Sequence, residues 1–241
     1  MKKYSRYKFK SEASMVKGIK PNFFNFLRKN VNKDEIILDL GCGSGELSIS
    51  LAGYCQKIVG LDNFSAYIKT AKIDKKNKKI KNVTFKLGDG EHLPFKNNIF
   101  DLVISSRGPL SANTHFLREA LRVLKPGGRL IEETIGETDK IELKKIFKRG
   151  QNFPIKVKKL ESVETMLKKF DAQIIYSEEF IYYQKFSSIS AVARTLSRTP
   201  IIEDFNRRQD QEKLNKLQAI YKNNIVLSSH RLWWLAVKGN K

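Results

Sequence analysis

Three glycines and an aspartate near the start of the chain have the residue types and spacing of a nucleotide site. Gly41, Gly43 and Gly45 directly follow an apolar run, residues 36–40, and Asp62 ends the next apolar run. Glycine lets the backbone turn sharply and approach a ligand closely, and the helix expected next presents free N–H groups at its positive end. A carboxylate about 20 residues after the first glycine is where ribose hydroxyls need an acceptor. This pairing predicts a nucleotide-like cofactor at the turn.

A second carboxylate, Asp39, narrows the kind of cofactor. It stands just before the first glycine, and the glycines read G-x-G-x-G rather than the G-x-G-x-x-G of dinucleotide sites. Asp39 would repel a pyrophosphate but attract a cofactor that carries an ammonium and a sulfonium. The charge therefore favours S-adenosylmethionine over NAD. A tight turn that binds no ligand is the alternative that the glycines alone leave open.

Five sequence blocks resemble, in order, those of the class I S-adenosylmethionine-dependent methyltransferases. The blocks are Leu-Asp-Leu-Gly-Cys-Gly-Ser-Gly at 38–45, Gly-Leu-Asp at 60–62, Leu-Gly-Asp-Gly-Glu-His-Leu-Pro-Phe at 87–95, Phe-Asp-Leu-Val-Ile-Ser at 100–105 and Leu-Arg-Val-Leu-Lys-Pro-Gly-Gly-Arg-Leu at 121–130. The resemblance runs from residue 36 to residue 133. It implies a Rossmann-like α/β fold, with a doubly wound seven-stranded sheet that is mostly parallel and has an antiparallel last strand.

The alternation of apolar runs with helical periodicity supports that architecture. Strands are expected near 36–40, 57–62, 82–87, 99–105 and 128–135, and helices near 46–54, 65–77, 112–124, 140–149 and 161–170. Right-handed crossovers between parallel strands then place the ligand-binding loops at the carboxyl edge of the sheet. A further helix over 14–30 is expected on the sheet edge, because its later apolar residues recur at helical spacing.

After residue 172 the pattern changes. A long strand over 173–186 precedes helix-like stretches over 189–197 and 210–222, and a last strand covers 231–238. We therefore expect one domain overall, built from four parts. These are an N-terminal helical and basic segment (1–34), the S-adenosylmethionine-binding methyltransferase core (35–186), a helical cap inserted over the active-site mouth (187–228) and the final core strand (229–241).

The resemblance assigns the cofactor contacts residue by residue. It implies that Asp39 and the backbone of the glycine turn contact the methionine part, that Asp62 binds the ribose, and that Asp89 accepts from the adenine amino group. Phe64 is either a stacking surface for the adenine or a core residue. The full predicted cofactor set is Asp39, Gly41, Gly43, Gly45, Asp62, Asn63, Phe64, Asp89, Gly90 and Ser105.

Methyl transfer from a sulfonium mainly needs the reacting atoms to be aligned in a dry site. The residues predicted to act on the acceptor are Arg107, His115 and Tyr183. Arg107 either holds a carboxylate or phosphate bidentately or is a surface arginine at a strand end. The aromatic residues around Tyr183 would form an apolar pocket for a small acceptor or a platform for a flipped base.

A hydroxyl or amine acceptor must also lose a proton. The candidate proton acceptors are His92, His115, His230, Glu132 and Glu133. His92 lies in one of the blocks assigned to the cofactor. His230 is expected at the start of the last strand, where a structural role is the alternative to accepting a proton. A phenolic or soft acceptor would need no base at all.

Composition leaves the acceptor open. The chain of 241 residues carries a net charge of +21, and positive potential attracts phosphate polymers. The residues after the expected fourth strand, Ser-Arg-Gly-Pro at 106–109, lack the Asn/Asp-Pro-Pro-aromatic signature of methyltransferases that act on base amino groups. No recognisable RNA-binding module adjoins the cofactor blocks. We therefore expect a small-molecule acceptor, with an RNA methyltransferase as the alternative and a non-catalytic cofactor-binding regulatory protein as a third class.

Cysteine usage and hydropathy give further expectations. Cys42 and Cys55 are the two cysteines, and their positions suggest neither a disulfide framework nor a metal site. No apolar run reaches about 18 residues and no signal core follows the first residues. These features predict a cytoplasmic protein without membrane insertion, and they leave the oligomeric state open.

Overall fold

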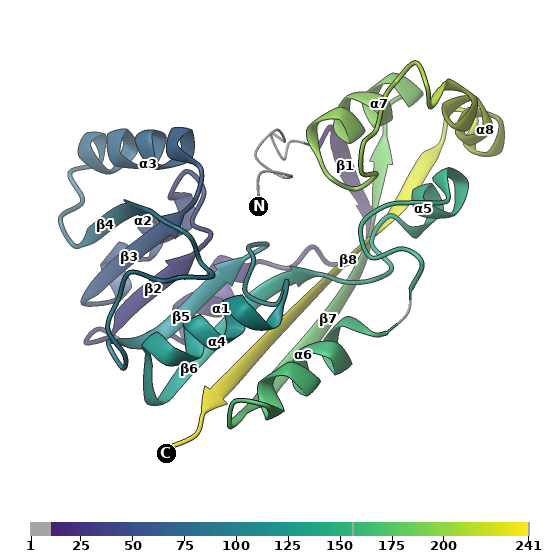
Figure 1. Ribbon diagram of the computed structural model, residues 1–241. Coiled ribbons are helices and arrows are strands. Elements are labelled where there is room, and N and C mark those ends of the chain that lie inside the picture. Colours follow the sequence, from purple (N-terminus) through teal and green to yellow (C-terminus); the bar gives the residue numbers. More distant parts are fainter. Residues whose placement is uncertain (1–10, 156, 241) are drawn as a thin grey trace. The chain divides into compact units, whose positions relative to one another are not determined.

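The computed structural model describes residues 11–155 and 157–240. Its strands are β1 (Ala13–Lys17), β2 (Ile36–Leu40), β3 (Lys57–Asp62), β4 (Val83–Leu87), β5 (Phe100–Ser106), β6 (Leu124–Ile135), β7 (Ala172–Phe186) and β8 (Ile225–Lys238). They form one mixed sheet in the order β1-β7-β8-β6-β5-β2-β3-β4 (Figure 1). The predicted Rossmann-like α/β class is confirmed. The predicted count of seven strands is wrong, because eight described segments pair.

In the described ranges, helices lie between consecutive strands except between β4 and β5. They are α1 (Phe23–Lys29), α2 (Glu46–Leu51), α3 (Ser65–Asn77), α4 (Thr114–Val123), α5 (Ile141–Phe147), α6 (Lys159–Lys168), α7 (Ile189–Arg198) and α8 (Gln211–Tyr221), with a short 3₁₀ turn at Ala52–Tyr54. β2 pairs in parallel with β3 and β5, β3 with β4, and β5 with β6. Since parallel neighbours end at the same edge, the turns after β2, β3, β4 and β5 share the carboxyl edge of the sheet.

Helix α4 shows how the local sequence builds this layer. The Asn113 side chain caps the helix, because its Oδ1 accepts hydrogen bonds from the backbone N–H groups of His115 (2.9 Å) and Phe116 (3.2 Å). Phe116, Leu117, Ala120, Leu121 and Val123 recur at helical spacing and are buried. The apolar stripe therefore packs into the core. Arg118 is exposed, whereas Glu119 and Arg122 pair with each other at 2.7 Å.

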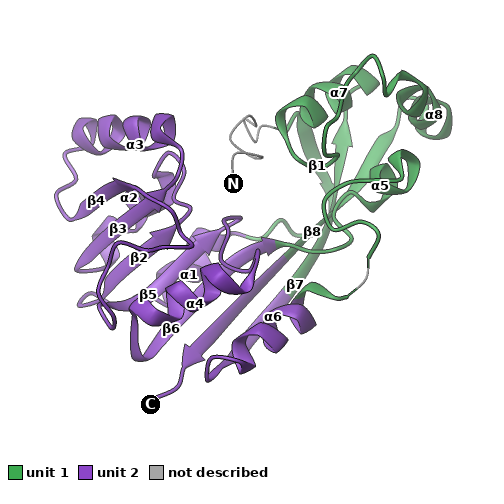
Figure 2. Cartoon of the chain, in the orientation of Figure 1, with its two compact units in different colours: residues 1–21, 135–159, 179–231 green, residues 22–134, 160–178, 232–241 purple. Residues whose placement is uncertain are grey.

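The chain divides into two compact units (Figure 2). Unit 1 comprises the described parts of residues 1–21, 135–159 and 179–231, and unit 2 those of residues 22–134, 160–178 and 232–241. The core of unit 2 includes Leu38, Val103, Leu117, Leu130 and Trp234. The core of unit 1 is formed mainly by the apolar faces of α5, α7 and α8, with Phe186 of β7. Each unit thus has its own hydrophobic cluster.

The N-terminal region differs from the prediction. Instead of a helix over 14–30, β1 pairs antiparallel with β7, and helix α1 begins only at Phe23. Gly18 between them has φ +84°, which ends β1 in a turn, and Asn22 then caps α1 by accepting from the backbone N–H of Asn25. The edge of β7 supplies the backbone hydrogen-bond partners of β1. Local periodicity in the sequence cannot reveal such a distant pairing. Residues 1–10 of the predicted basic segment lie outside the described residues.

Two other strands begin earlier than predicted. β6 begins at Leu124 rather than at 128, since its pairing with β5 continues across a register shift that takes up the Pro-Gly-Gly sequence. β8 begins at Ile225 rather than at 231, which places His230 inside the strand instead of at its start. The predicted cap range contains α7 and α8, and its function as a cap stays a prediction. Within the described ranges no helix has the length and apolar character needed to cross a bilayer.

Candidate functional site

The glycine turn lies in unit 2, between β2 and α2. Its first two N–H groups, of Gly41 and Cys42, both donate to the carbonyl of Leu61 at 2.8 and 3.1 Å, which holds the turn beside the end of β3. Gly43 has φ +53°, and a Cβ built there meets no atom within 4 Å. The protein's own packing therefore does not exclude a side chain at Gly43, and the turn leaves open space at that point.

Gly45 stands in a different environment at the start of α2. It has φ +80°, and a Cβ built there would lie 2.4 Å from the ring of Phe85 and 2.9 Å from Ala71. Packing between the turn, β4 and α3 therefore requires glycine at this position. Packing of the fold thus requires glycine at Gly45, whereas Gly43 borders open space next to the turn.

Asp62 holds the glycine turn and the start of α3 together. Its Oδ2 accepts a hydrogen bond from the backbone N–H of Gly43 at 2.9 Å, and its Oδ1 accepts one from that of Phe64, also at 2.9 Å. Each carboxylate oxygen has further lone-pair capacity. The predicted ribose acceptor thus lies directly beside the glycine with open space.

Asp39 is almost fully buried at the end of β2. The hydroxyl of Ser48 donates to its Oδ2 at 2.5 Å. Burial raises the pKa of Asp39 from its usual value near 3.8 to about 7, while the Ser48 hydrogen bond lowers it and the charge of Asp62 raises it further. Asp39 is therefore a carboxyl group whose ionisation a nearby cation would favour near neutral pH.

The predicted adenine side consists of an aromatic pair and an exposed turn. The rings of Phe64 and Tyr67 pack edge to face, with centroids 4.8 Å apart. Asp89 is exposed, and its Oδ1 accepts from the backbone N–H of Glu91 at 2.9 Å, while Gly90 is buried against Phe116 and Leu40. Tyr67, in the first turn of α3, was not among the predicted site residues.

A second polar cluster lies at the carboxyl ends of β5 and β6 in unit 2. The Trp233 indole N–H donates to Glu133 Oε2 at 3.1 Å, and Ser106 Oγ donates to Glu133 Oε1 at 3.3 Å. Arg107 is half-exposed, with its Nε 3.6 Å from Glu133 Oε1. These contacts assemble the predicted Arg107 and Glu133 at the carboxyl edge of β5 and β6.

Two neighbours of this cluster are structural in the observed geometry. Ser105 is fully buried, and its hydroxyl donates to the carbonyl of Leu40 at 3.0 Å, which joins β5 to β2. Glu132 is fully buried and accepts from the indole N–H of Trp234 (3.0 Å) and the backbone N–H of Ser111 (3.1 Å). Both side chains therefore already have partners within the sheet and its loops.

The remaining candidates belong to both units. The side chain of His92 is 83% exposed and lies 4.0 Å from Asp89, and His115 is exposed in the first turn of α4. Tyr183 belongs to β7 in unit 1, where the Lys17 ammonium lies 5.9 Å from its ring centroid. His230, also in unit 1, is buried and its Nδ1 lies 2.7 Å from the Thr138 hydroxyl, so it is tied to a neighbouring loop.

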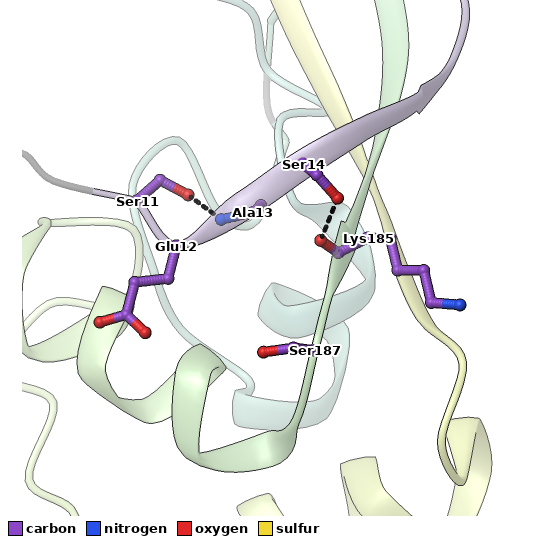
Figure 3. Close-up of a pocket in the computed structure, with 6 residues that line it drawn as sticks. All are labelled: Ser11, Glu12, Ala13, Ser14, Lys185 and Ser187. Carbon is purple, nitrogen blue, oxygen red and sulfur yellow. Dashed lines mark hydrogen bonds between the residues drawn. The ribbon is translucent and has the colours of Figure 1, made fainter.

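A pocket of about 460 Å³ in unit 1 contains none of the predicted site residues. It is lined by Ser11, Glu12, Ala13, Ser14, Lys185 and Ser187, and the Lys185 side chain extends away from Glu12 (Figure 3). Glu12 forms ion pairs with Arg194 (2.8 Å) and Arg198 (3.1 Å) of α7. These two arginines of the expected cap are therefore already partnered with a carboxylate of their own unit.

The cysteines show no sign of nucleophilic chemistry. Cys42 and Cys55 are both buried free thiols. Burial, followed by the charges of Asp39 and Asp62, raises the pKa of Cys42 well above its usual range, which disfavours the thiolate. Within residues 11–155 and 157–240, no group of three or more His, Cys, Asp or Glu side chains is arranged to hold a metal ion.

Comparison with known proteins places this geometry in a family. The profile of a family described as a methyltransferase domain matches residues 31–221. Demethylmenaquinone methyltransferase of Lactiplantibacillus plantarum is 39% identical over 101 residues, which cover 39% of this chain and 43% of that protein. The corresponding enzyme of Lactococcus lactis is 37% identical over 100 residues, covering 39% of this chain and 40% of that protein. The chain thus matches less than half the length of these curated relatives.

Solved structures show the same fold. YcgJ of Bacillus subtilis covers 90% of this chain and 98% of its own, with a TM-score of 0.67 and 17% identity. A putative methyltransferase of Bacillus halodurans covers the same shares, with a TM-score of 0.69 and 17% identity. The family match covers most of the chain and includes the glycine turn, Asp62, Arg107 and Glu133. This chain belongs to the methyltransferase-domain family.

Proposed function

We propose that the protein is an S-adenosylmethionine-dependent methyltransferase with a small-molecule acceptor. The observation that carries the proposal is a glycine turn with open space at Gly43, beside the carboxylate of Asp62 and near the buried Asp39. A compact ligand with hydroxyl donors and positive charge suits these acceptors. The family match supports the same assignment.

The residues present fit this cofactor. Asp62 would hold the ribose hydroxyls, the turn at Gly41 and Gly43 with Asp39 would contact the methionine part, and Asp89 would accept from the adenine amino group. Phe64, with Asn63, would border the adenine. When bound, S-adenosylmethionine supplies a methyl group on a sulfonium, which is already activated for direct displacement.

The acceptor side is best assigned to the cluster at the carboxyl ends of β5 and β6. Arg107 is half-exposed there, and Glu133 receives hydrogen bonds from Trp233 and Ser106 that fix its carboxylate. We assign Arg107 to binding an anionic or polar group of the acceptor and Glu133 to positioning Arg107. His115 and Tyr183 stay predictions.

A small-molecule acceptor is supported by the names of the relatives. The Lactiplantibacillus and Lactococcus proteins are named for methylating demethylmenaquinone, a small quinone-type molecule. Their similarity to this chain covers less than half of their length, so the chemical class of acceptor is proposed and its identity is not. The net charge of +21 is the reason for the alternative of an RNA acceptor. None of the relatives described above is named for acting on RNA.

Asp39 should make cofactor affinity depend on pH. The pKa of Asp39 is about 7 in the free protein, and a cationic ligand favours the ionised carboxylate. Affinity should therefore rise with pH up to about 7, by at most about tenfold per pH unit, and level off above it. Asp39→Asn should bind more weakly and without this rise. Calorimetric titrations with S-adenosylmethionine over a pH series test the prediction, and a parallel slope in both proteins would contradict it.

The same shift has a consequence for stability in the absence of ligand. The folded carboxyl of Asp39 retains its proton up to about pH 7, whereas the unfolded chain releases it near 3.8. Between these values the folded state binds more protons, so stability should fall as pH rises. Asp39→Asn should remove this part of the pH dependence, as measured by urea unfolding at several pH values.

Arg107 should affect turnover without affecting the cofactor. Arg107→Gln removes the charge and the forked donors of the guanidinium. We expect kcat/KM for the acceptor to be at least about tenfold lower in this variant than in the wild type. The measurement needs an identified acceptor. Cofactor affinity should stay within about twofold, because no predicted cofactor contact involves this side chain. Arg118→Gln, at an exposed position on α4, is the control. Equal turnover by both variants would remove Arg107 from the acceptor site.

Labelled methyl transfer tests the acceptor class. The protein is incubated with S-adenosylmethionine labelled in its methyl group and with separated metabolite, RNA and protein fractions of cells. Saturable label in the metabolite fraction is the expected result. Saturable, site-specific label in RNA at physiological salt would contradict the small-molecule assignment and establish the alternative.

A further inference from the structure

Residues 15–20 of unit 1 form a continuously exposed stretch of apolar and basic side chains. Met15 and Val16 of β1 are each 50% exposed, and Ile19 in the following turn is 78% exposed. Lys17 and Lys20 are exposed among them, and no acidic residue occurs in this stretch. β1 is the edge strand of the sheet. Large apolar side chains on an edge strand favour association with another surface.

β7 extends this surface. A Cβ on Gly18 would lie 2.9 Å from the carbonyl oxygen of Ile181, so the turn after β1 lies directly on the β7 backbone. Ile181 is itself 53% exposed, and Lys17 pairs across the ladder with Tyr183, two residues further along β7. We use the name basic apolar edge for Met15, Val16, Lys17, Ile19, Lys20 and Ile181.

Charge decides what kind of partner suits the basic apolar edge. The chain carries +21, so a second copy would bring like charges together at Lys17 and Lys20. A nucleic acid would pair with the lysines but would leave the isoleucines and valine in water. An anionic bilayer surface satisfies both groups, because apolar side chains enter the interface while lysines meet the headgroups.

Nearby acidic charge is compensated at Glu12 but not at Glu179, since its neighbour His230 counts as neutral in the net charge of +21. Glu12, which precedes β1, is ion-paired with Arg194 and Arg198 of α7. Glu179 on β7 is half-exposed and lies 3.8 Å from His230. We propose that the basic apolar edge docks on an anionic lipid surface, with unit 1 lying on the interface rather than crossing it. The proposal is independent of methyl transfer.

Vesicle binding tests this docking. The full chain is centrifuged with vesicles of phosphatidylcholine alone and with vesicles that also contain phosphatidylglycerol. We expect binding to the anionic vesicles, lowered at least about tenfold by Val16→Ser combined with Ile19→Ser. Lys17→Gln should lower it about fivefold. Ile220→Ser on α8, where Ile220 is 56% exposed in the same unit, should bind like the wild type.

Three outcomes would overturn the proposal. The first is undiminished anionic binding by the serine double variant, since the net charge alone would then explain it. The second is equal binding to both kinds of vesicle. The third is self-association in sedimentation velocity that the double variant abolishes while vesicles bind neither protein, because a second copy would then cover the edge. Thermal melting by circular dichroism confirms that each variant is folded before it is scored.

Discussion

Asp62→Ala is expected to weaken binding of S-adenosylhomocysteine by roughly 10- to 150-fold. The carboxylate would lose its hydrogen bonds to the ribose, and bonds to a charged group contribute about 1.5–3 kcal/mol. The variant also removes the acceptor of the Gly43 and Phe64 N–H groups, which would loosen the turn that the ligand contacts. Equilibrium dialysis with labelled ligand measures the loss.

Two further variants separate the ribose contact from general effects. Asp62→Asn keeps one oxygen that can accept from Gly43 or Phe64 but loses the charge, so its affinity should fall between those of wild type and Asp62→Ala. Asp34→Ala, at an exposed position in the same unit, should bind like the wild type. An unchanged affinity of Asp62→Ala would remove Asp62 from the site.

Gly43→Ala and Gly45→Ala are expected to differ in what they damage. At Gly43 a Cβ meets open space, so the folded protein should lose only about 1–2 kcal/mol for the left-handed backbone. The methyl group would occupy space next to the turn, and cofactor affinity should fall at least about tenfold, or about 1.4 kcal/mol. At Gly45 the Cβ overlaps Phe85 and Ala71, so stability should fall more, by several kcal/mol.

Urea unfolding and ligand dialysis on the same two variants compare these effects. The expected pattern is a folded, poorly binding Gly43→Ala and a markedly destabilised Gly45→Ala. If Gly43→Ala bound the ligand as tightly as the wild type, the open space at Gly43 would not be the cofactor site. Equal stability of the two variants would contradict the packing assigned to Gly45.

The parallel part of the fold was predictable because its signals are local. The strand at 36–40, the glycine turn and Asp62 occur within a short stretch of sequence, and parallel pairing of the following strands brings them to one edge. Helix α4 was equally clear from its apolar spacing. These elements need only periodicity, turn chemistry and the rule for crossovers.

The N-terminal strand was not predictable in the same way. β1 depends on pairing with β7, about 170 residues away in sequence, as in the contact of Ala13 with Phe186. Apolar spacing over 14–30 favoured a helix, and the pairing outweighed it. The partners of Glu132 and Glu133 were hidden for the same reason, since the indoles of Trp233 and Trp234 come from the last strand.

The most direct test of the cofactor assignment is a calorimetric titration of the wild-type protein with S-adenosylmethionine, S-adenosylhomocysteine and NAD. The buried Asp39 and the carboxylate of Asp62 beside Gly43 predict saturable binding of the first two ligands with one site per chain, and no measurable binding of NAD. Binding of NAD in preference to S-adenosylmethionine, or heats that show no binding of either adenosyl ligand, would contradict the assignment.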